Sequence, residues 1–146
     1  MLHEALASLE LSNHPTTMNQ SYKPDGYTSV SPYLLVSDAK QTIAFLVEVF
    51  GATPLRSFAD PSGRLMHAEV RLDDTVLMLA DSTPEWPPIP CYVHVYVSDV
   101  DATYQKALAA GAISAQEPMQ KGDEDKRGGV QDPYGTTWWI ATRQNK

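Results

Sequence analysis

The sequence predicts an α+β fold made of two similar modules, each containing a strand, a helix and three further strands in that order. Strand-like and helix-like patterns alternate along the chain, a proline-rich segment divides it, and short strings recur on both sides. VSD stands at 36–38 and at 97–99, and TVLMLA at 75–80 matches TTWWIA at 136–141 in its first and last residues. Both pairs are 61 positions apart (36 to 97, 75 to 136). Unless these short matches are coincidence, positions 61 apart occupy equivalent places in two modules related by pseudo-twofold symmetry.

The first module is expected at residues 26–81. Residues 28–36 are rich in β-branched and aromatic types, which predicts a strand. A helix should follow from the capping residues Ser37 and Asp38 to Gly51, because apolar residues recur between them at helical spacing. Alternating or β-rich strings then predict three strands, at 54–59, 65–72 and 75–80.

A segment with four prolines, STPEWPPIP at 82–90, follows the first module. Proline is excluded from helix interiors and central strands, so we expect an extended linker here. The pattern restarts in a second module at 91–142, with a strand at 91–97, a helix capped by Ser98 or Asp99, and strands at 113–119 and 136–141. The charged, glycine-containing string KGDEDKRGG at 121–129 predicts a loop.

Composition and charge narrow the functional classes. The chain of 146 residues carries a net charge of −7, which opposes binding to nucleic acid or to anionic membranes. No apolar run reaches the length of a membrane-spanning helix. The single cysteine, Cys91, allows no intrachain disulfide and no multi-cysteine zinc site. The N-terminal string MLHEALASLELSNH lacks the cationic start and apolar block of a secretory signal, so we expect a cytoplasmic protein.

Residues 1–25 are expected to form an N-terminal extension. The string LHEALASLEL places its apolar residues on one side of a helix that is too short to be stable alone in water. We therefore expect this helix to pack on another surface of the chain or on a partner chain. A chain that starts at Met18 should keep its fold and its ligand binding.

Four strings carry a family resemblance: SPYLLVSDAKQTIAFLVEVFGA, GRLMHAEVRLDDTVLMLAD, YVSDVDATYQKALAAGA and GGVQDPYGTTWWIAT, in this order between residues 26 and 142. Together they resemble the vicinal oxygen chelate superfamily, which includes glyoxalase, bleomycin-resistance and extradiol-dioxygenase proteins, and most of all its PhnB-like, glyoxalase-like branch. The resemblance implies a mixed sheet, built from both modules, that curls around a ligand-binding cleft with the helices outside. It also implies a homodimer, which would cover exposed strand edges.

In the metal-dependent relatives four positions ring the metal. The resemblance carries these positions to Ser31, Met78, Tyr92 and Trp139, and the 61-residue offset relates the first to the third and the second to the fourth. None of the four side chains is a carboxylate or an imidazole, which divalent metals prefer as ligands. We therefore expect a cleft without a metal, and no other cofactor.

Strand alternation adds further residues to this cleft. Tyr33 shares a face with Ser31, whereas His67 and Glu69 lie opposite the apolar face of their own strand. Of the two adjacent tryptophans, Trp139 should form the floor of the cleft while Trp138 faces the helices. With Arg127 at the rim, the candidate ligand-binding residues are Ser31, Tyr33, His67, Glu69, Met78, Tyr92, His94, Tyr96, Arg127 and Trp139.

Several of these residues have a purely structural alternative. His67 and Glu69 also suit an exposed strand face, His94 suits a packed core position, and Met78 with Trp139 suits a filled cleft. A metal site built from His67, Glu69 and His94 is conceivable in composition. Trp86 in the linker suits either a ligand anchor or a pin that holds the linker to the body of the protein.

The sequence favours a metal-free protein that binds a small aromatic or planar molecule, of the resistance or sequestration type. Two other classes stay open. One is a lyase, isomerase or dioxygenase that uses a metal or His67 and Glu69 as an acid–base pair, and the other is an interaction protein with a vestigial cleft. An open cavity between Tyr92, His94 and Trp139 would favour the metal-free binding protein.

Overall fold

A computed structural model of the chain describes residues 22–144. The chain divides into two compact units, residues 1–30 and 31–146. The described part of the first unit contains a turn in which the Tyr27 amide donates to the Pro24 carbonyl at 3.2 Å. The helix expected near the N-terminus lies outside the described residues. Among residues 22–144, no helix is long and apolar enough to cross a membrane.

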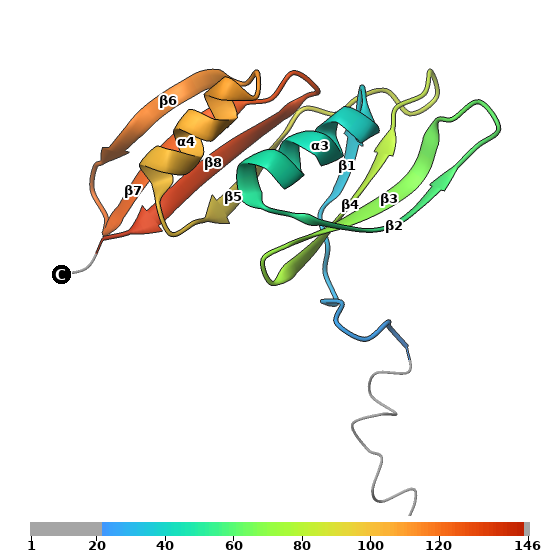
Figure 1. The fold of residues 1–146 in the computed structure, drawn as a ribbon, viewed down its shortest axis with the longest axis horizontal. Coiled ribbons are helices and arrows are strands. Elements are labelled where there is room, and N and C mark those ends of the chain that lie inside the picture. The colour runs from blue at the N-terminus through green and yellow to red at the C-terminus, as the bar shows by residue number, and fades with distance from the viewer. Residues whose placement is uncertain (1–21, 145–146) are drawn as a thin grey trace, which may run out of the picture. The chain divides into compact units, whose positions relative to one another are not determined.

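The second unit begins with a βαβββ module (Figure 1). Its elements are β1 (Tyr33–Val36), α3 (Ala39–Phe50), β2 (Thr53–Ala59), β3 (Leu65–Leu72) and β4 (Thr75–Asp81). The strands form a four-stranded sheet in the order β1-β4-β3-β2. The β1–β4 pair is parallel and the other pairs are antiparallel. This mixed topology follows from the chain order. The crossover through α3 lets β2 run in the same direction as β1, and two reversals of the chain, from β2 to β3 and from β3 to β4, then make β4 parallel to β1.

A second module repeats this order after the linker (Figure 1). Its elements are β5 (Cys91–Tyr96), α4 (Val100–Ala109), β6 (Ile113–Gln120), β7 (Asp125–Gln131) and β8 (Thr136–Arg143). The sheet order is β5-β8-β7-β6, with β5 and β8 parallel. The predicted α+β fold of two βαβββ modules is therefore confirmed. The strands form two four-stranded sheets, and these do not close into one.

Helix capping explains where both helices begin. Asp38 precedes α3 in an extended conformation, and its carboxylate accepts a hydrogen bond from the Gln41 amide at 3.1 Å. Asp99 does the same for α4 through the Ala102 amide. These two aspartates occupy the positions of the repeated VSD string, so the repeat in the sequence marks the start of each crossover helix.

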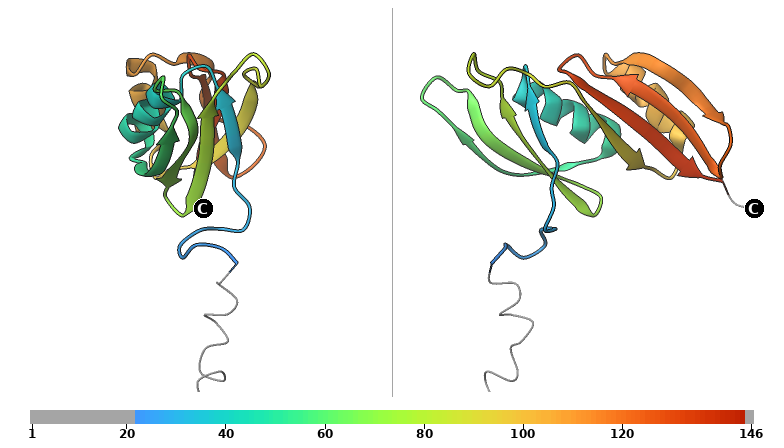
Figure 2. Two further views of the ribbon diagram at one scale, coloured as in Figure 1. Left: turned by 90° about the vertical axis from the view of Figure 1, so that its right-hand side faces the viewer. Right: turned by 180° about the vertical axis from the view of Figure 1, so that it is seen from behind.

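The helices cover one face of each sheet and leave the other face without a helix. When the structure is seen from behind, the strands lie in front of the helices (Figure 2). The covered faces supply a core that both modules share, since the rings of Phe50 and Trp138 lie 5.5 Å apart between their centroids. The Ser37 amide also donates to the Tyr134 carbonyl at 3.3 Å, which joins the end of β1 to the turn before β8.

The loop prediction for 121–129 is wrong over its second half, because β7 begins at Asp125. The two glycines that suggested a loop are needed for close packing. A Cβ atom at Gly128 would lie 3.0 Å from the Pro118 ring, and one at Gly129 would lie 2.6 Å from the Trp139 ring. Glycine inside a strand is typical of such close approaches.

Two smaller differences concern the first module. The predicted strand at 28–36 is regular only from Tyr33 onward. The pairing of β2 with β3 shifts register between Phe58 and Ala59, which pair with His67 and Leu65. This irregularity buries Leu65 and leaves Met66 47% exposed, although simple alternation placed Met66 on the apolar face.

Candidate functional site

The face of each sheet that no helix covers carries most of the candidate residues. We call the first open face the surface formed by Tyr33, Leu35, His67, Glu69 and Met78. We call the second open face the surface formed by Tyr92, His94, Tyr96, Asp125, Arg127 and Trp139. Cross-strand pairs support these groups, because Tyr33 pairs with Met78 in the first sheet and His94 pairs with Trp139 in the second. Ser31 precedes β1 and is half-buried.

A chain of hydrogen bonds crosses the first open face. The Tyr33 hydroxyl lies 3.0 Å from His67 Nδ1, and His67 Nε2 lies 2.8 Å from Glu69 Oε2. Arg56 on β2 donates from Nε to Glu69 Oε1 at 3.0 Å. Glu69 is only 2% exposed, so the alternative of an ordinary exposed strand face is wrong for this residue. A buried carboxylate requires partners such as these.

A hollow of about 680 Å³ lies beside the first open face. Its lining is mostly apolar or aromatic and includes Tyr33, Leu35, Met66, Trp86 and Ile89. Trp86 and Ile89 come from the proline-rich linker and are 66% and 57% exposed, respectively. The Ile89 amide donates to the Leu35 carbonyl at 3.1 Å, which holds the linker at the edge of the sheet. Trp86 is therefore a wall of an open hollow, consistent with the ligand-anchor alternative.

Two charged residues that line the hollow, Asp81 and Arg64, bind other parts of the protein, whereas Glu85, which also lines it, is exposed. The Asp81 carboxylate accepts hydrogen bonds from the Ala39 and Leu65 amides at 2.6 and 2.8 Å. Arg64 pairs with Asp60 at 3.2 Å and donates to the Asp81 carbonyl. The hollow consequently offers a ligand mainly aromatic and apolar surface, together with the carboxylate of Glu85.

On the second open face, Trp139 and Tyr92 form an aromatic pair. Their ring centroids lie 5.9 Å apart with the rings nearly perpendicular. Trp138, the neighbour of Trp139, is fully buried in the core and donates from its indole nitrogen to Asp132 at 2.8 Å. The two tryptophans thus lie on opposite faces of β8. Tyr92 is 76% exposed, whereas Trp139 is partly buried.

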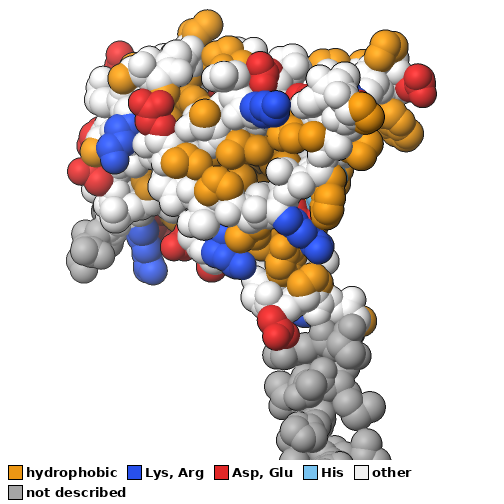
Figure 3. Space-filling view, turned by 45° about the vertical axis from the view of Figure 1, so that its right-hand side comes forward, with side chains coloured by type: hydrophobic (Ala, Val, Ile, Leu, Met, Phe, Trp, Pro, Cys, Tyr) orange, Lys and Arg blue, Asp and Glu red, His pale blue; other side chains and the backbone are white. Residues whose placement is uncertain are grey.

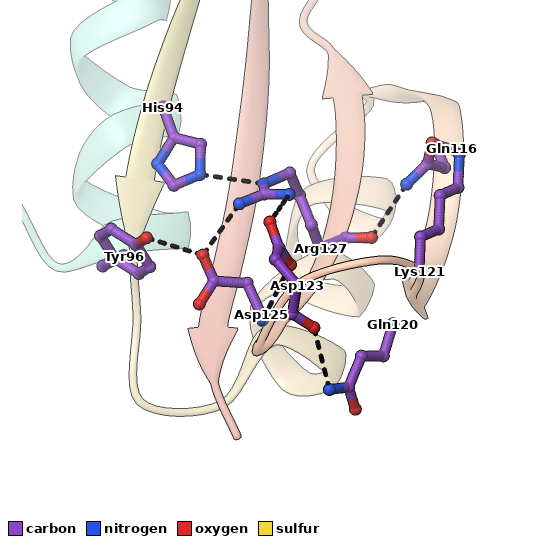
Figure 4. Close-up of polar contacts among 8 residues, drawn as sticks. All are labelled: His94, Tyr96, Gln116, Gln120, Lys121, Asp123, Asp125 and Arg127. Carbon is purple, nitrogen blue, oxygen red and sulfur yellow. Dashed lines mark hydrogen bonds and ion pairs between the residues drawn. The ribbon is translucent and has the colours of Figure 1, made fainter. Parts of the chain in front are cut away.

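A polar network occupies the rest of the second open face (Figure 4). Arg127 is its centre, with Nη2 2.8 Å from Asp125 and Nε 3.1 Å from His94 Nε2. Arg127 also pairs with Asp123 at 3.5 Å. The Tyr96 hydroxyl donates to Asp125 at 2.6 Å. His94 is exposed, so the alternative of a packed core histidine is wrong.

These contacts shift two pKa values. Partial burial of its ring, followed by the nearby positive charge of Arg127, lowers the pKa of His94, and Asp125 opposes this only in part. The His94 ring therefore accepts a proton less readily than an ordinary histidine. The hydrogen bond to Asp125 raises the pKa of Tyr96, because that bond requires the phenolic proton.

The donor set at the four expected metal positions does not fit a divalent metal. Ser31, Met78, Tyr92 and Trp139 supply a hydroxyl, a thioether, a phenol and an indole, which are poor ligands for such ions. Across residues 22–144, no three or more His, Cys, Asp or Glu side chains are grouped so that they could hold a metal ion. His67 and Glu69 bind each other, whereas His94 binds Arg127.

Sequence reasoning missed several residues of this region. Arg56 and Asp125 belong to the two networks, but Arg56 lay on a strand without a clear polar face and Asp125 was placed in a loop. The hollow itself was also missed. Its residues come from β1, β3, β4, the linker, the turn before β3 and the first residue of β5, and no periodic pattern joins these segments.

Known proteins are similar to this chain in sequence or in structure. A Mycobacterium tuberculosis protein described only as uncharacterized is 37% identical over 126 residues, covering 77% of this chain and 73% of that protein. The structure of TnmS3, described as an antibiotic binding protein from Streptomyces sp. CB03234, aligns with a TM-score of 0.61 at 23% identity, covering 81% of this chain and 100% of that chain. The structure of the PhnB protein from Bacillus cereus aligns with a TM-score of 0.62 at 18% identity, covering 79% of this chain and 99% of that chain.

The family follows from a direct match of the sequence. Residues 25–140 match the Glyoxalase/Bleomycin resistance protein/Dioxygenase superfamily, and this range includes both modules and the linker. The predicted resemblance is therefore confirmed, and the chain belongs to the glyoxalase/bleomycin resistance protein/dioxygenase superfamily.

Proposed function

We propose that this protein binds a small aromatic or planar molecule without a metal. The observation that carries the proposal is the hollow of about 680 Å³ lined by Trp86, Ile89, Leu35, Met66 and Tyr33. Small-molecule sites are concave and mostly apolar, with a few polar groups that fix the ligand's orientation. Aromatic walls favour flat ligands, because stacked rings gain free energy beyond simple burial of area.

Two further observations support this proposal. The side chains at the expected metal positions are poor metal ligands, which weakens the case for metal-dependent chemistry in this chain. TnmS3, which shares the fold at 23% identity, is described as an antibiotic binding protein. A resistance or sequestration role, in which the protein binds and holds a flat aromatic molecule, is consistent with an aromatic hollow.

A thermal-shift screen tests the proposal directly. Protein dialysed against EDTA is mixed with a panel of planar aromatic compounds, and a binder should raise the melting temperature in a concentration-dependent way. Ile89→Ala and Ile113→Ala form a matched pair, because both isoleucines are exposed but Ile89 lines the hollow and Ile113 lies on β6. Ile89→Ala should reduce the shift and Ile113→Ala should not. Equal effects of the two variants, or no binder in the panel, would contradict the proposal.

We also propose that the protein is a homodimer. Large hydrophobic side chains are exposed on both sheets, including Phe58 at 51%, Tyr92 at 76% and Tyr96 at 61%. On the face that Figure 3 shows, several hydrophobic side chains lie close together. Exposed large apolar side chains often mark interaction surfaces where they gather into patches. Sedimentation at micromolar concentration should give twice the chain mass of 16.1 kDa, and a species of 16.1 kDa would contradict the dimer.

A further inference from the structure

We infer that Tyr33 makes the hollow selective for planar ligands that carry a hydroxyl or N–H group. Its phenolic oxygen can accept a hydrogen bond from such a group but has no proton left to donate. The inference rests on the proposed function and concerns the same hollow. It follows from which atom carries the proton in each of the hydrogen bonds that run from Glu69 through His67 to Tyr33.

The first step is the proton between His67 and Glu69. Arg56, whose guanidinium is always charged, donates to Oε1 of the buried Glu69 carboxylate. An ionised carboxylate only accepts hydrogen bonds, so Oε2 must receive one from His67 Nε2 across the 2.8 Å contact. The ring proton of neutral His67 therefore lies on Nε2.

The second step is the proton between His67 and Tyr33. A neutral imidazole carries one ring proton, so with Nε2 protonated, Nδ1 has only a lone pair. The Tyr33 hydroxyl, 3.0 Å away, must then donate its single proton to Nδ1. Tilted ring contacts from Tyr33 and Phe58, with centroids 5.6 and 6.2 Å from that of His67, flank the imidazole.

The third step concerns the ligand. Tyr33 lines the hollow and is 51% exposed, and we infer that a molecule bound there contacts its oxygen. With its proton committed to His67, that oxygen presents lone pairs only. A phenol, an aromatic amine or a ring N–H would pair with it. An ether or a quinone carbonyl at the same position would place one acceptor against another, leaving both unpaired in a partly desolvated site.

The test compares 1-naphthol with 1-methoxynaphthalene, which share a ring system and differ in the hydrogen-bond donor. Isothermal titration calorimetry at pH 8, where histidine side chains are ordinarily neutral, should show wild-type protein binding 1-naphthol about 2- to 10-fold more tightly, the value of one hydrogen bond. Tyr33→Phe should bring this ratio to about one. Tyr22→Phe is the matched control, because Tyr22 is an exposed tyrosine that does not line the hollow, and it should keep the wild-type ratio.

Glu69→Gln provides a sharper test, because it should reverse the preference. Arg56 would hold the amide oxygen of the new side chain, so its NH₂ group would face His67 Nε2 and donate to it. His67 would then carry its proton on Nδ1 and donate to Tyr33, and the Tyr33 hydroxyl would turn its own proton to the ligand. We expect this variant to bind 1-methoxynaphthalene at least as tightly as 1-naphthol, provided that circular dichroism shows the wild-type fold.

The outcomes separate the two proposals. If wild-type protein binds both probes with equal affinity, the role of Tyr33 is wrong while the proposed aromatic site stands. If it binds neither probe, both the role of Tyr33 and the aromatic site are overturned. If Glu69→Gln does not fold, the Tyr33→Phe ratio decides alone, since Tyr33 is half exposed and the phenyl ring is retained. An unchanged preference in Tyr33→Phe would overturn the inference.

Discussion

The ring of Trp139 lies directly against Gly129 on the neighbouring strand, so close that a Cβ atom at Gly129 would come within 2.6 Å of the indole carbons Cε3 and Cζ3. Gly129 and Trp139 are cross-strand partners in the β7–β8 pair. The glycine therefore sets the position of the indole on the second open face.

Gly129→Ala should destabilise the fold, because the added methyl group must displace the Trp139 ring or bend β7. Overpacking of this kind typically costs about 1–3 kcal/mol, which urea denaturation can measure. Gly122→Ala is the control, since a Cβ atom there meets nothing within 4 Å. In a Trp139→Ala background the cost of Gly129→Ala should largely disappear. Full additivity of the two changes would contradict the packing argument.

Truncation of the two adjacent tryptophans should have unequal effects. Trp138 is fully buried and binds Asp132, so we expect Trp138→Ala to lower the free energy of unfolding by about 3–5 kcal/mol. Trp139 is only partly buried, so Trp139→Ala should cost clearly less. Chemical denaturation of both variants gives the comparison, and equal losses would show that the second open face is packed as tightly as the core.

The pKa of His94 should lie below the ordinary histidine value of about 6.5. The unfolded chain would then take up a proton at this histidine before the folded chain does. As pH falls below about 6.5, the free energy of unfolding should therefore decrease, and above that pH the contribution of His94 is fully present. NMR titration of the His94 ring protons checks the direction, and a value above 6.5 would contradict it.

Arg127→Gln should raise the pKa of His94, because it removes a nearby positive charge and leaves Asp125 unopposed. Lys126→Gln is a matched control, since Lys126 is the preceding cation on β7 but pairs with Asp101. The same NMR titration should show a shift for the Arg127 variant only. A similar shift in both variants would mean that overall charge, rather than the contact with Arg127, sets the pKa.

Elemental analysis tests the expectation that the protein holds no functional metal. After dialysis against buffer, we expect far less than one transition-metal ion per chain, because the side chains at the expected positions are poor ligands. Near-stoichiometric Zn, Mn or Fe that survives dialysis would contradict this expectation and favour a metal-dependent function.

Most of the fold could be predicted from the sequence, because strand alternation and helix capping depend on residues that are close together in the chain. β3 spans residues 65–72 as predicted, since its polar and apolar residues alternate, and both helices begin at the predicted aspartates. β7 was missed because Gly128 and Gly129 look like loop residues in one dimension. The reason for glycine at these two positions is the close contact with Pro118 and Trp139, which only the folded structure shows.

The candidate site was less predictable for a related reason. Strand alternation placed His67 and Glu69 on the correct face, but neither their mutual hydrogen bond nor the burial of Glu69 follows from alternation. The hollow depends on Trp86 and Ile89, whose linker has no periodic pattern. Irregular segments acquire their places from tertiary contacts, which a single sequence does not reveal.

Duplication of the module has a consequence for the number of binding sites. A repeat with identical side chains would carry the hydrogen bonds of Tyr33 twice, once on each open face. Tyr33 and His94 stand 61 positions apart, yet Tyr33 binds His67 whereas His94 accepts from Arg127. Of these two residues only Tyr33 lines the hollow, so the proposed site does not repeat with the fold.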